Sequence, residues 1–394
     1  MKWYANGISA AILATTLGLG LVGCGTSTTA ATNASSRQDT QAIVAQTSQT
    51  SAESTAESTA ETGDTYTDRD LAQTADLSSA TSIAVESGQD VSITKEGVYV
   101  LSGTATNATI SVDVDSNAKV QLVLDNLTLE NETKPAIYVL SADKVFVTTA
   151  QGSTNKLTTS GTFAADGENN VDGVIFSKDD LVLNGQGTLA ISSSDNGVVS
   201  KDDLKVTGGT YSMACNGDAL QANDGVYVAD GNLELVASSD GIQGDARVQI
   251  DGGTITISGA EGIESTYVQI NQGKVSISAS DDGINATQKS ETSTDTPTIE
   301  IAGGEVAVEM GSGDTDALDA NGNIVVSGGT ISITAQSAFD YDGTTEFTGG
   351  TIYVNGEQVT TIENSMMGGG MGGRMGGEMP GGGMGGGMMG GPRQ

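Results

Sequence analysis

A repeated pattern occupies the chain from Val171 to Gly356 and restricts its fold more than any other feature of the sequence. Each copy runs from an acidic residue through a short strand of alternating polarity to a glycine turn, and then through a second alternating strand. Alignment of the copies on this turn brings into register Gly187, Gly209, Gly231, Gly253, Gly273, Gly304, Gly329 and Gly350. Intervals of about 20 to 25 residues are typical of one coil of a three-sided parallel β-helix. We therefore predict an all-β fold, a right-handed single-stranded parallel β-helix with disordered N- and C-terminal segments.

The alternation within each strand predicts which side chains point into the β-helix. In the coil around Gly253, Val248 and Ile250 precede the turn, and Ile255 and Ile257 follow it. Equivalent residues recur in the other copies, so we expect each coil to be held mainly by its neighbours. The chain between residues 83 and 150 alternates in the same way without the regular acidic residue. We expect it to form irregular first coils, because a repeat array needs an atypical end.

Charge and composition exclude several classes of function. The chain has 50 acidic residues, 16 lysines and arginines and no histidine, which gives a formal net charge of −34. Such a polyanion repels nucleic acid and anionic lipid headgroups, so we expect no nucleic-acid partner. The absence of histidine removes the commonest general base and the commonest ligand of transition metals. Binding of hard cations by oxygen atoms remains compatible with this composition.

The N-terminal residues indicate export. An apolar stretch over residues 8–22 is too short for an ordinary membrane span and leads into Gly-Cys. We interpret residues 1–23 as a lipoprotein signal peptide and Cys24 as the lipidated N-terminus of the mature protein. The alternative is an ordinary signal peptide that contains a cysteine. Either way we expect a secreted protein, and with lipidation one anchored to the cell membrane on its extracellular or periplasmic side.

Composition also predicts the limits of the folded part. Residues 24–76 are rich in Ser, Thr and Ala and have almost no large apolar side chain, so we expect a disordered linker. Residues 77–363 form the predicted β-helix domain, which we expect to be monomeric. Residues 364–394 are rich in Gly and Met and lack apolar periodicity, so we expect a disordered tail.

Acidic and amide residues recur at two positions of the repeat. The first column is Asp172, Asp195, Asp218, Asp240, Glu261, Asp282 and Asp316, and the second is Gln221, Gln243, Glu264, Asn285, Asp319 and Asp340. Equivalent positions on successive coils of a β-helix lie about 4.8 Å apart. Two carboxylates at this distance repel by roughly 1 to 3 kcal/mol. Basic residues are few in this part of the chain, so the repulsion calls for another source of positive charge.

A divalent cation would supply that charge, and Ca²⁺ suits the site because it binds carboxylate, carboxamide and carbonyl oxygens. We predict calcium between the coils, most of all around Asp282 with Asn285 and around Asp316 with Asp319 and Asp340. The predicted metal ligands are Asp218, Asp240, Glu261, Glu264, Asp282, Asn285, Asp316, Asp319 and Asp340. The alternative is that the acids accept hydrogen bonds from the backbone of their own turns, as Asp does before Gly.

Several segments together resemble a known family. They are GVYVLSGT, KVQLVLDNLTL and AIYVLSADKVFVTTAQGSTNKL, followed by the repeated Asp-Gly coils and the Gly/Met-rich tail. Over about residues 83–356 the chain resembles the bacterial carbohydrate-binding β-helix family related to polysaccharide lyases. The resemblance implies a right-handed parallel β-helix, bound Ca²⁺ and a polysaccharide ligand, either polygalacturonate (pectin-like) or cellulosic. It does not identify the residues that contact sugar.

Aromatic residues are scarce, so few side chains can stack on a sugar. Our candidates for carbohydrate contact are Tyr227, Arg247 and Tyr267, and the alternative for each is an ordinary surface side chain. We expect noncatalytic, calcium-dependent binding of polysaccharide at the bacterial cell surface, with no catalytic residues.

Two kinds of alternative function remain open. One is catalytic: a calcium-dependent lyase of the pectate-lyase type with Arg247 or a lysine as base, or a hydrolase with Asp179 and Asp180 facing Asp202 and Asp203. The other is a structural or adhesive β-helix on the cell surface.

Overall fold

The computed structural model describes residues 65–167, 169–289, 294–313 and 315–365. Four predicted features lie wholly or mostly outside these residues: the signal peptide, the proposed lipidation of Cys24, the linker and the Gly/Met-rich tail. Within them, no helix is long and apolar enough to cross a membrane.

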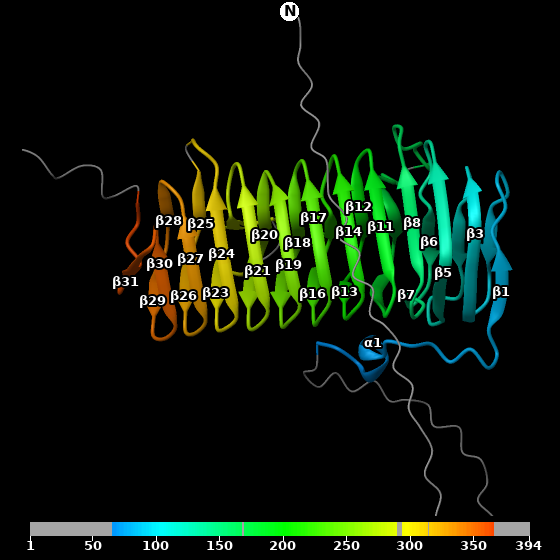
Figure 1. Ribbon diagram of the computed structural model, residues 1–394, viewed down its shortest axis with the longest axis horizontal. Coiled ribbons are helices and arrows are strands. Elements are labelled where there is room, and N and C mark those ends of the chain that lie inside the picture. Colours follow the sequence, from blue (N-terminus) through cyan, green and yellow to red (C-terminus); the bar gives the residue numbers. More distant parts are fainter. Residues whose placement is uncertain (1–64, 168, 290–293, 314, 366–394) are drawn as a thin grey trace, which may run out of the picture. The chain divides into compact units, whose positions relative to one another are not determined.

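The folded part is a parallel β-helix of about 11 turns (Figure 1), which confirms the predicted fold class. Each complete coil contributes one strand to each of three faces. Face 1 begins at the acidic residue of the repeat, face 2 precedes the glycine turn, and face 3 follows it. In one coil β18 (Asp240–Ile250) covers face 1 and then face 2, with an irregularity between Gly244 and Arg247 at the corner, and β19 (Thr254–Gly259) forms face 3.

The strands stack face by face. Face 1 contains β2 (Val91–Ile93), β4 (Ile110–Asp113), β6 (Ile137–Ser141), β9 (Gly173–Ser177), β12 (Asn196–Ser200), β15 (Leu220–Ala222), the first parts of β18 and β20 (Glu261–Ile270), β22 (Ile284–Ala286), β25 (Asp316–Ala320) and β28 (Ser337–Tyr341). Face 2 contains β1 (Thr81–Ala84), the first parts of β3 (Gly97–Thr106) and β5 (Lys119–Asn131), β7 (Lys144–Thr149), β10 (Asp180–Gly185), β13 (Leu204–Val206), β16 (Gly225–Val228), the second parts of β18 and β20, β23 (Thr298–Ile301), β26 (Asn323–Val326) and β29 (Thr345–Phe347). Face 3 contains the second parts of β3 and β5, β8 (Thr154–Thr159), β11 (Thr188–Ser193), β14 (Thr210–Cys215), β17 (Asn232–Ala237), β19, β21 (Lys274–Ala279), β24 (Glu305–Met310), β27 (Thr330–Thr334) and β30 (Thr351–Val354).

The interior is one continuous apolar column, as the alternation predicted. Val248, Ile250, Ile255 and Ile257 are all buried, and their equivalents in the other coils belong to the same cluster. The glycine turn allows close contact between coils: Gly253 has a φ of +85°, and a Cβ there would lie 2.8 Å from the carbonyl oxygen of Gly231. A larger residue is therefore excluded by both conformation and space.

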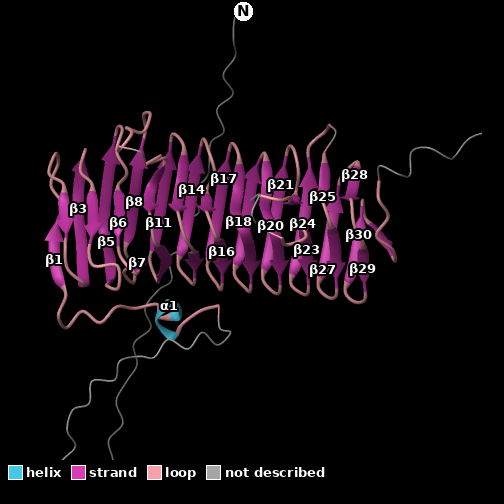
Figure 2. Ribbon diagram, turned by 180° about the vertical axis from the view of Figure 1, so that it is seen from behind, coloured by secondary structure: helices cyan, strands magenta, loops and turns pink. Residues whose placement is uncertain are grey.

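The first coils are irregular but continue the same three faces, as predicted. The register shifts between Leu101 and Gly103 on β3 and between Val112 and Asp113 on β4. At the other end β31 (Glu357–Val359), labelled in Figure 1, pairs antiparallel with β30 and ends the parallel stacking; Figure 2 shows β30 at this end from behind.

The predicted linker extends too far toward the C-terminus. Residues 65–76 are part of the folded unit, and they include the short helix α1 (Asp68–Leu71). The helix has a capping box between Thr67 and Asp70, and the Asp70 side chain is fully buried. Polar contacts hold this segment, so the absence of apolar periodicity gave no sign of its order. We call Thr65–Gln73 the strap.

We expect Ile255→Ala to lower the free energy of unfolding by about 2 to 5 kcal/mol, because it leaves a cavity in the apolar column. The adjacent exposed residue provides the control: Thr256→Ala should have little effect. Equilibrium denaturation in urea measures both. Similar losses of stability for the two variants would contradict the assigned inward and outward directions.

Candidate functional site

The predicted polar columns form on face 1. Strand pairing aligns Gln221 with Gln243, Gln243 with Glu264, Glu264 with Asn285, Asn285 with Asp319 and Asp319 with Asp340. In the other column Asp240 pairs with Glu261. Sequence alignment of the repeats therefore identified the correct neighbours across the insertion that follows Asn285.

Three carboxylates of these columns come closest together. Asp240, Glu261 and Glu264 each offer an oxygen, and these oxygens lie within 4.8 Å of one another. Glu264 also forms an ion pair with the ammonium group of Lys289, from the insertion between β22 and β23. We missed this lysine as a partner because spacing within the repeat does not predict where an inserted loop returns.

Two amide side chains beside these carboxylates have unpaired oxygens. The Asn285 amide nitrogen donates to Glu261 Oε2 at 3.1 Å, and the Gln243 amide nitrogen donates to Asp245 Oδ1 at 2.8 Å. The buried oxygens Asn285 Oδ1 and Gln243 Oε1 then have no hydrogen-bond partner among the residues that the structure describes. A buried oxygen without a partner costs free energy. Three carboxylates and two such amide oxygens are a donor set that fits Ca²⁺.

The pKa values show how strongly this cluster disfavours negative charge. Burial, followed by the nearby carboxylates Asp218, Glu261 and Glu264, raises the pKa of Asp240 to about 8. Burial and then Glu264 raise the pKa of Glu261 to about 7. A cation bound here would reverse these shifts by stabilising the ionised forms.

The acids further along face 1 also repel each other. Burial and neighbouring carboxylates raise the pKa of Asp319 to about 7, while burial raises that of Asp282 to about 6 against an opposing backbone hydrogen bond to Asp316. In the described part of the chain, however, these residues do not form a trio of acids as close as the one around Asp240. Asp340 accepts a hydrogen bond of 2.8 Å from the side chain of Asn364.

Some acids of the first column accept hydrogen bonds from backbone N–H groups, but these groups are not those of their own turns. Asp218 Oδ1 accepts the Asp240 N–H at 3.0 Å, and Asp282 Oδ1 accepts the Asp316 N–H at 3.1 Å. Each acid therefore binds the next coil rather than its own turn. These contacts support the register of face 1 and leave the second carboxylate oxygen for other interactions.

A second close trio, Asp202, Asp203 and Asp224, lies at the corner between faces 1 and 2. Burial, followed by Asp180, raises the pKa of Asp203 to about 6. The hydrolase alternative pairs Asp202 and Asp203 with Asp179 and Asp180. Asp180 instead forms an ion pair of 3.3 Å with Lys144.

The three candidate carbohydrate residues meet on face 2. Tyr227, Arg247 and Tyr267 line one hollow of about 360 Å³, together with Asp295, Thr296 and others. The Arg247 guanidinium lies 4.3 Å from the centre of the Tyr267 ring, and its Nη1 donates to Gln269 Oε1 at 2.8 Å. The ring and the guanidinium thus form a stacked pair at the rim of the hollow. The contribution of Asp295 and Thr296, from the insertion, was not predicted.

The carboxylate cluster around Asp240 and the hollow lined by Tyr227, Arg247 and Tyr267, which we call the aromatic hollow, lie on either side of the corner between faces 1 and 2. β18 and β20 each carry a carboxylate of the cluster before the corner and a hollow residue after it. The insertion between β22 and β23 provides Lys289 to one site and Asp295 to the other.

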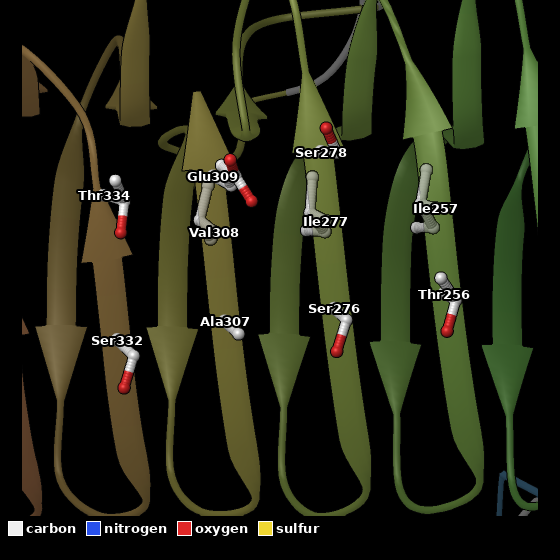
Figure 3. A pocket seen from close by; sticks show the side chains of 10 residues that line it. All are labelled: Thr256, Ile257, Ser276, Ile277, Ser278, Ala307, Val308, Glu309, Ser332 and Thr334. Atoms are coloured by element: carbon white, nitrogen blue, oxygen red, sulfur yellow. The ribbon is translucent and has the colours of Figure 1, made fainter. Parts of the chain in front are cut away.

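Face 3 carries another hollow. Figure 3 shows Thr256, Ser276, Ala307 and Ser332 in one row across neighbouring strands. They line a hollow of about 280 Å³. Its lining has no aromatic or basic side chain, so it offers less to a sugar than the hollow on face 2.

The chain belongs to the carbohydrate-binding domain family: the family described as "Carbohydrate-binding domain-containing protein" matches residues 87–359. A carbohydrate-binding domain-containing protein of Acetivibrio thermocellus is 35% identical over 130 residues, which are 32% of this chain and 46% of the relative. The match thus spans less than half of that relative's length. Among solved structures, a polysaccharide lyase-like protein from C. thermocellum, in a gadolinium derivative, gives a TM-score of 0.42 at 23% identity, over 70% of this chain and 94% of that one.

We expect the melting temperature in chelator to rise as the pH falls from about 8 toward 5. The folded-state pKa values of Asp240 and Glu261 lie above the ordinary carboxyl values near 4, so between these values the folded state binds more protons and gains stability on acidification. Calorimetry across this pH range measures the effect. Asp240→Asn should flatten the profile, whereas Glu234→Gln on face 3 should not. A melting temperature that falls on acidification would contradict this account.

Proposed function

We propose that the protein binds polysaccharide noncatalytically and in a calcium-dependent manner at the bacterial cell surface. The single observation that carries the proposal is the pairing of two sites at one corner of the β-helix: the carboxylate cluster on face 1 and the aromatic hollow on face 2. Membership of the carbohydrate-binding domain family supports a polysaccharide as the ligand.

Calcium is proposed first at the trio of Asp240, Glu261 and Glu264, with the amide oxygens of Gln243 and Asn285. The donor set supports this choice, because three close carboxylates and unpaired carbonyl oxygens are the ligands that Ca²⁺ prefers. The remaining predicted ligands extend the site in both directions along face 1: Asp218, Asp282, Asp316, Asp319 and Asp340. Bound calcium would cancel the repulsion between coils and provide positive charge for an acidic polymer.

In the proposed complex Tyr227 and Tyr267 provide ring surfaces to sugars, and Arg247 provides a positive charge beside them. A guanidinium recognises a carboxylate through paired hydrogen bonds, so Arg247 favours an acidic polymer such as polygalacturonate over a neutral one. A cellulosic polymer would use the rings more than the arginine. The protein would contact the membrane only through the lipid at Cys24, and would act as a monomer.

A lyase is the competing proposal, and Arg247 is its candidate base. The stacking of Arg247 on Tyr267 and its hydrogen bond to Gln269 support a binding role instead. A purely structural or adhesive surface protein is the third possibility, in which neither site takes a soluble ligand.

Replacement of a ligand in the cluster should weaken calcium binding. Because affinity depends on the number of charged ligands, we expect Asp240→Asn and Glu261→Gln each to weaken binding by roughly tenfold or more. Isothermal titration calorimetry at about 0.15 M salt, which screens the general negative charge, measures this. Glu234→Gln removes one charge from face 3 and should bind as the wild type does. Equal affinities for all of these proteins would exclude the proposed site.

Polysaccharide binding should require both calcium and face 2. Retention on insoluble polygalacturonate should be lost in chelator, and Arg247→Ala or Tyr267→Ala should lower affinity by about tenfold, or about 1.4 kcal/mol. Thr256→Ala on face 3 is the control. An assay for unsaturated ultraviolet-absorbing ends should find no turnover. Turnover abolished by Arg247→Ala would establish a lyase, and neither retention nor turnover would favour the structural protein.

A further inference from the structure

The strap, Thr65–Gln73, lies across the outward surface of face 2. Its C-terminal residue, Gln73, accepts the Gly185 N–H at 2.9 Å and donates to the Thr207 carbonyl at 2.8 Å. Near its N-terminus the Tyr66 hydroxyl donates to Asp251 Oδ2 at 2.9 Å. The strap therefore reaches from β10 and β13 to the end of β18, the strand that carries Arg247. Its helix, α1, is labelled in Figure 1.

At the centre of the strap, Asp70 occupies a basic site formed by the β-helix. Its carboxylate is fully buried and lies 3.3 Å from Lys144 Nζ and 4.0 Å from Lys205 Nζ. The two lysines project outward from β7 and β13, with β10 between them. This is a carboxylate-binding site on the surface of the β-helix, and a side chain of the same protein fills it.

The basic site and the aromatic hollow meet at Lys205 and Tyr227 on face 2. Lys205 pairs in register with Tyr227, and its ammonium group lies 5.6 Å from the centre of that ring. Arg247 pairs with Gly225, two residues before Tyr227, and Tyr267 pairs with Arg247, so these two side chains form a neighbouring row on the next two coils. The same ammonium group donates to the Thr65 carbonyl at 2.9 Å, so Lys205 contacts both the strap and the hollow.

We propose that the strap covers one end of a longer groove for acidic polysaccharide, and that the Lys144 and Lys205 site binds a uronate carboxylate when the polymer displaces Asp70. The inference rests on the proposed function and adds a second sugar site and its regulation. It also suggests how a strongly acidic protein accepts an acidic polymer, because Lys144, Lys205 and Arg247 each place a positive charge on face 2. The strap is suited to displacement, since polar contacts hold it and Leu71 is 46% exposed.

Variants in which the strap is held less firmly should bind short galacturonate oligomers more tightly. Tyr66→Phe and Gln73→Ala each remove hydrogen bonds of the strap and leave the Asp70 ion pairs in place. With calcium present, we expect the full-length double variant to bind about three- to tenfold more tightly, because less free energy is spent on displacing the strap. Lys205→Ala in this background should remove the gain. Glu130→Gln, which breaks an exposed ion pair with Lys156 on face 3, is the control and should not change affinity.

Proteolysis tests displacement directly in the wild-type protein. Trypsin cleavage after Arg69, followed by mass spectrometry, should become faster when galacturonate oligomers are added and remain unchanged with cello-oligosaccharides. If the wild type binds galacturonate but the double variant gains no affinity and cleavage does not change, the strap proposal is overturned and the proposed function stands. If neither the wild type nor any variant binds galacturonate, both are overturned for this ligand.

Discussion

Every feature of this protein depends on the hydrogen bonding of each coil to the next in parallel register. This stacking places equivalent residues of the repeat about 4.8 Å apart along each face. The stacking stabilises apolar residues, because Ile255 packs on its equivalents and forms a column that no single coil could bury. It destabilises acidic residues, because an acid at the same position of every coil produces a row of mutually repelling carboxylates. Burial and then this repulsion raise the pKa values of Asp240 and Glu261.

The molecule meets this repulsion in different ways along face 1. Asp218 and Asp282 each accept a hydrogen bond from a backbone N–H of the next coil, and this bond stabilises the charged carboxylate. Glu264 has the ammonium group of Lys289. Around Asp240, the backbone hydrogen bonds and the Lys289 ion pair still leave close carboxylates and unpaired amide oxygens. This local excess of oxygen acceptors distinguishes a candidate cation site from an ordinary acidic surface.

Several positively charged side chains lie on face 2 rather than beside the stacked carboxylates of face 1. Lys144, Lys205 and Arg247 all project from face 2, where they lie beside aromatic rings or beside the buried Asp70. Face 2 also carries acids, with Asp180 beside Lys144 and Glu300 accepting a hydrogen bond from the Tyr267 hydroxyl, so its positive charge is local. Because β18 and β20 run from the carboxylate cluster to the aromatic hollow, a polymer bound in the hollow would lie beside the corner that follows the cluster.

The sequence by itself determined what repeats. The alternation predicted the inward column, the glycine spacing predicted the coils, and the acid spacing predicted which side chains align on face 1, because the register of a β-helix is a direct copy of its repeat. The scarcity of aromatic residues also singled out Tyr227, Arg247 and Tyr267 as candidates for sugar contact. Only the tertiary structure decided which carboxylates approach closely, where Lys289 returns, and that Asp70 is buried. Those outcomes depend on corners, on an inserted loop and on a strap held by polar contacts, and none of these carries a period that a sequence can reveal.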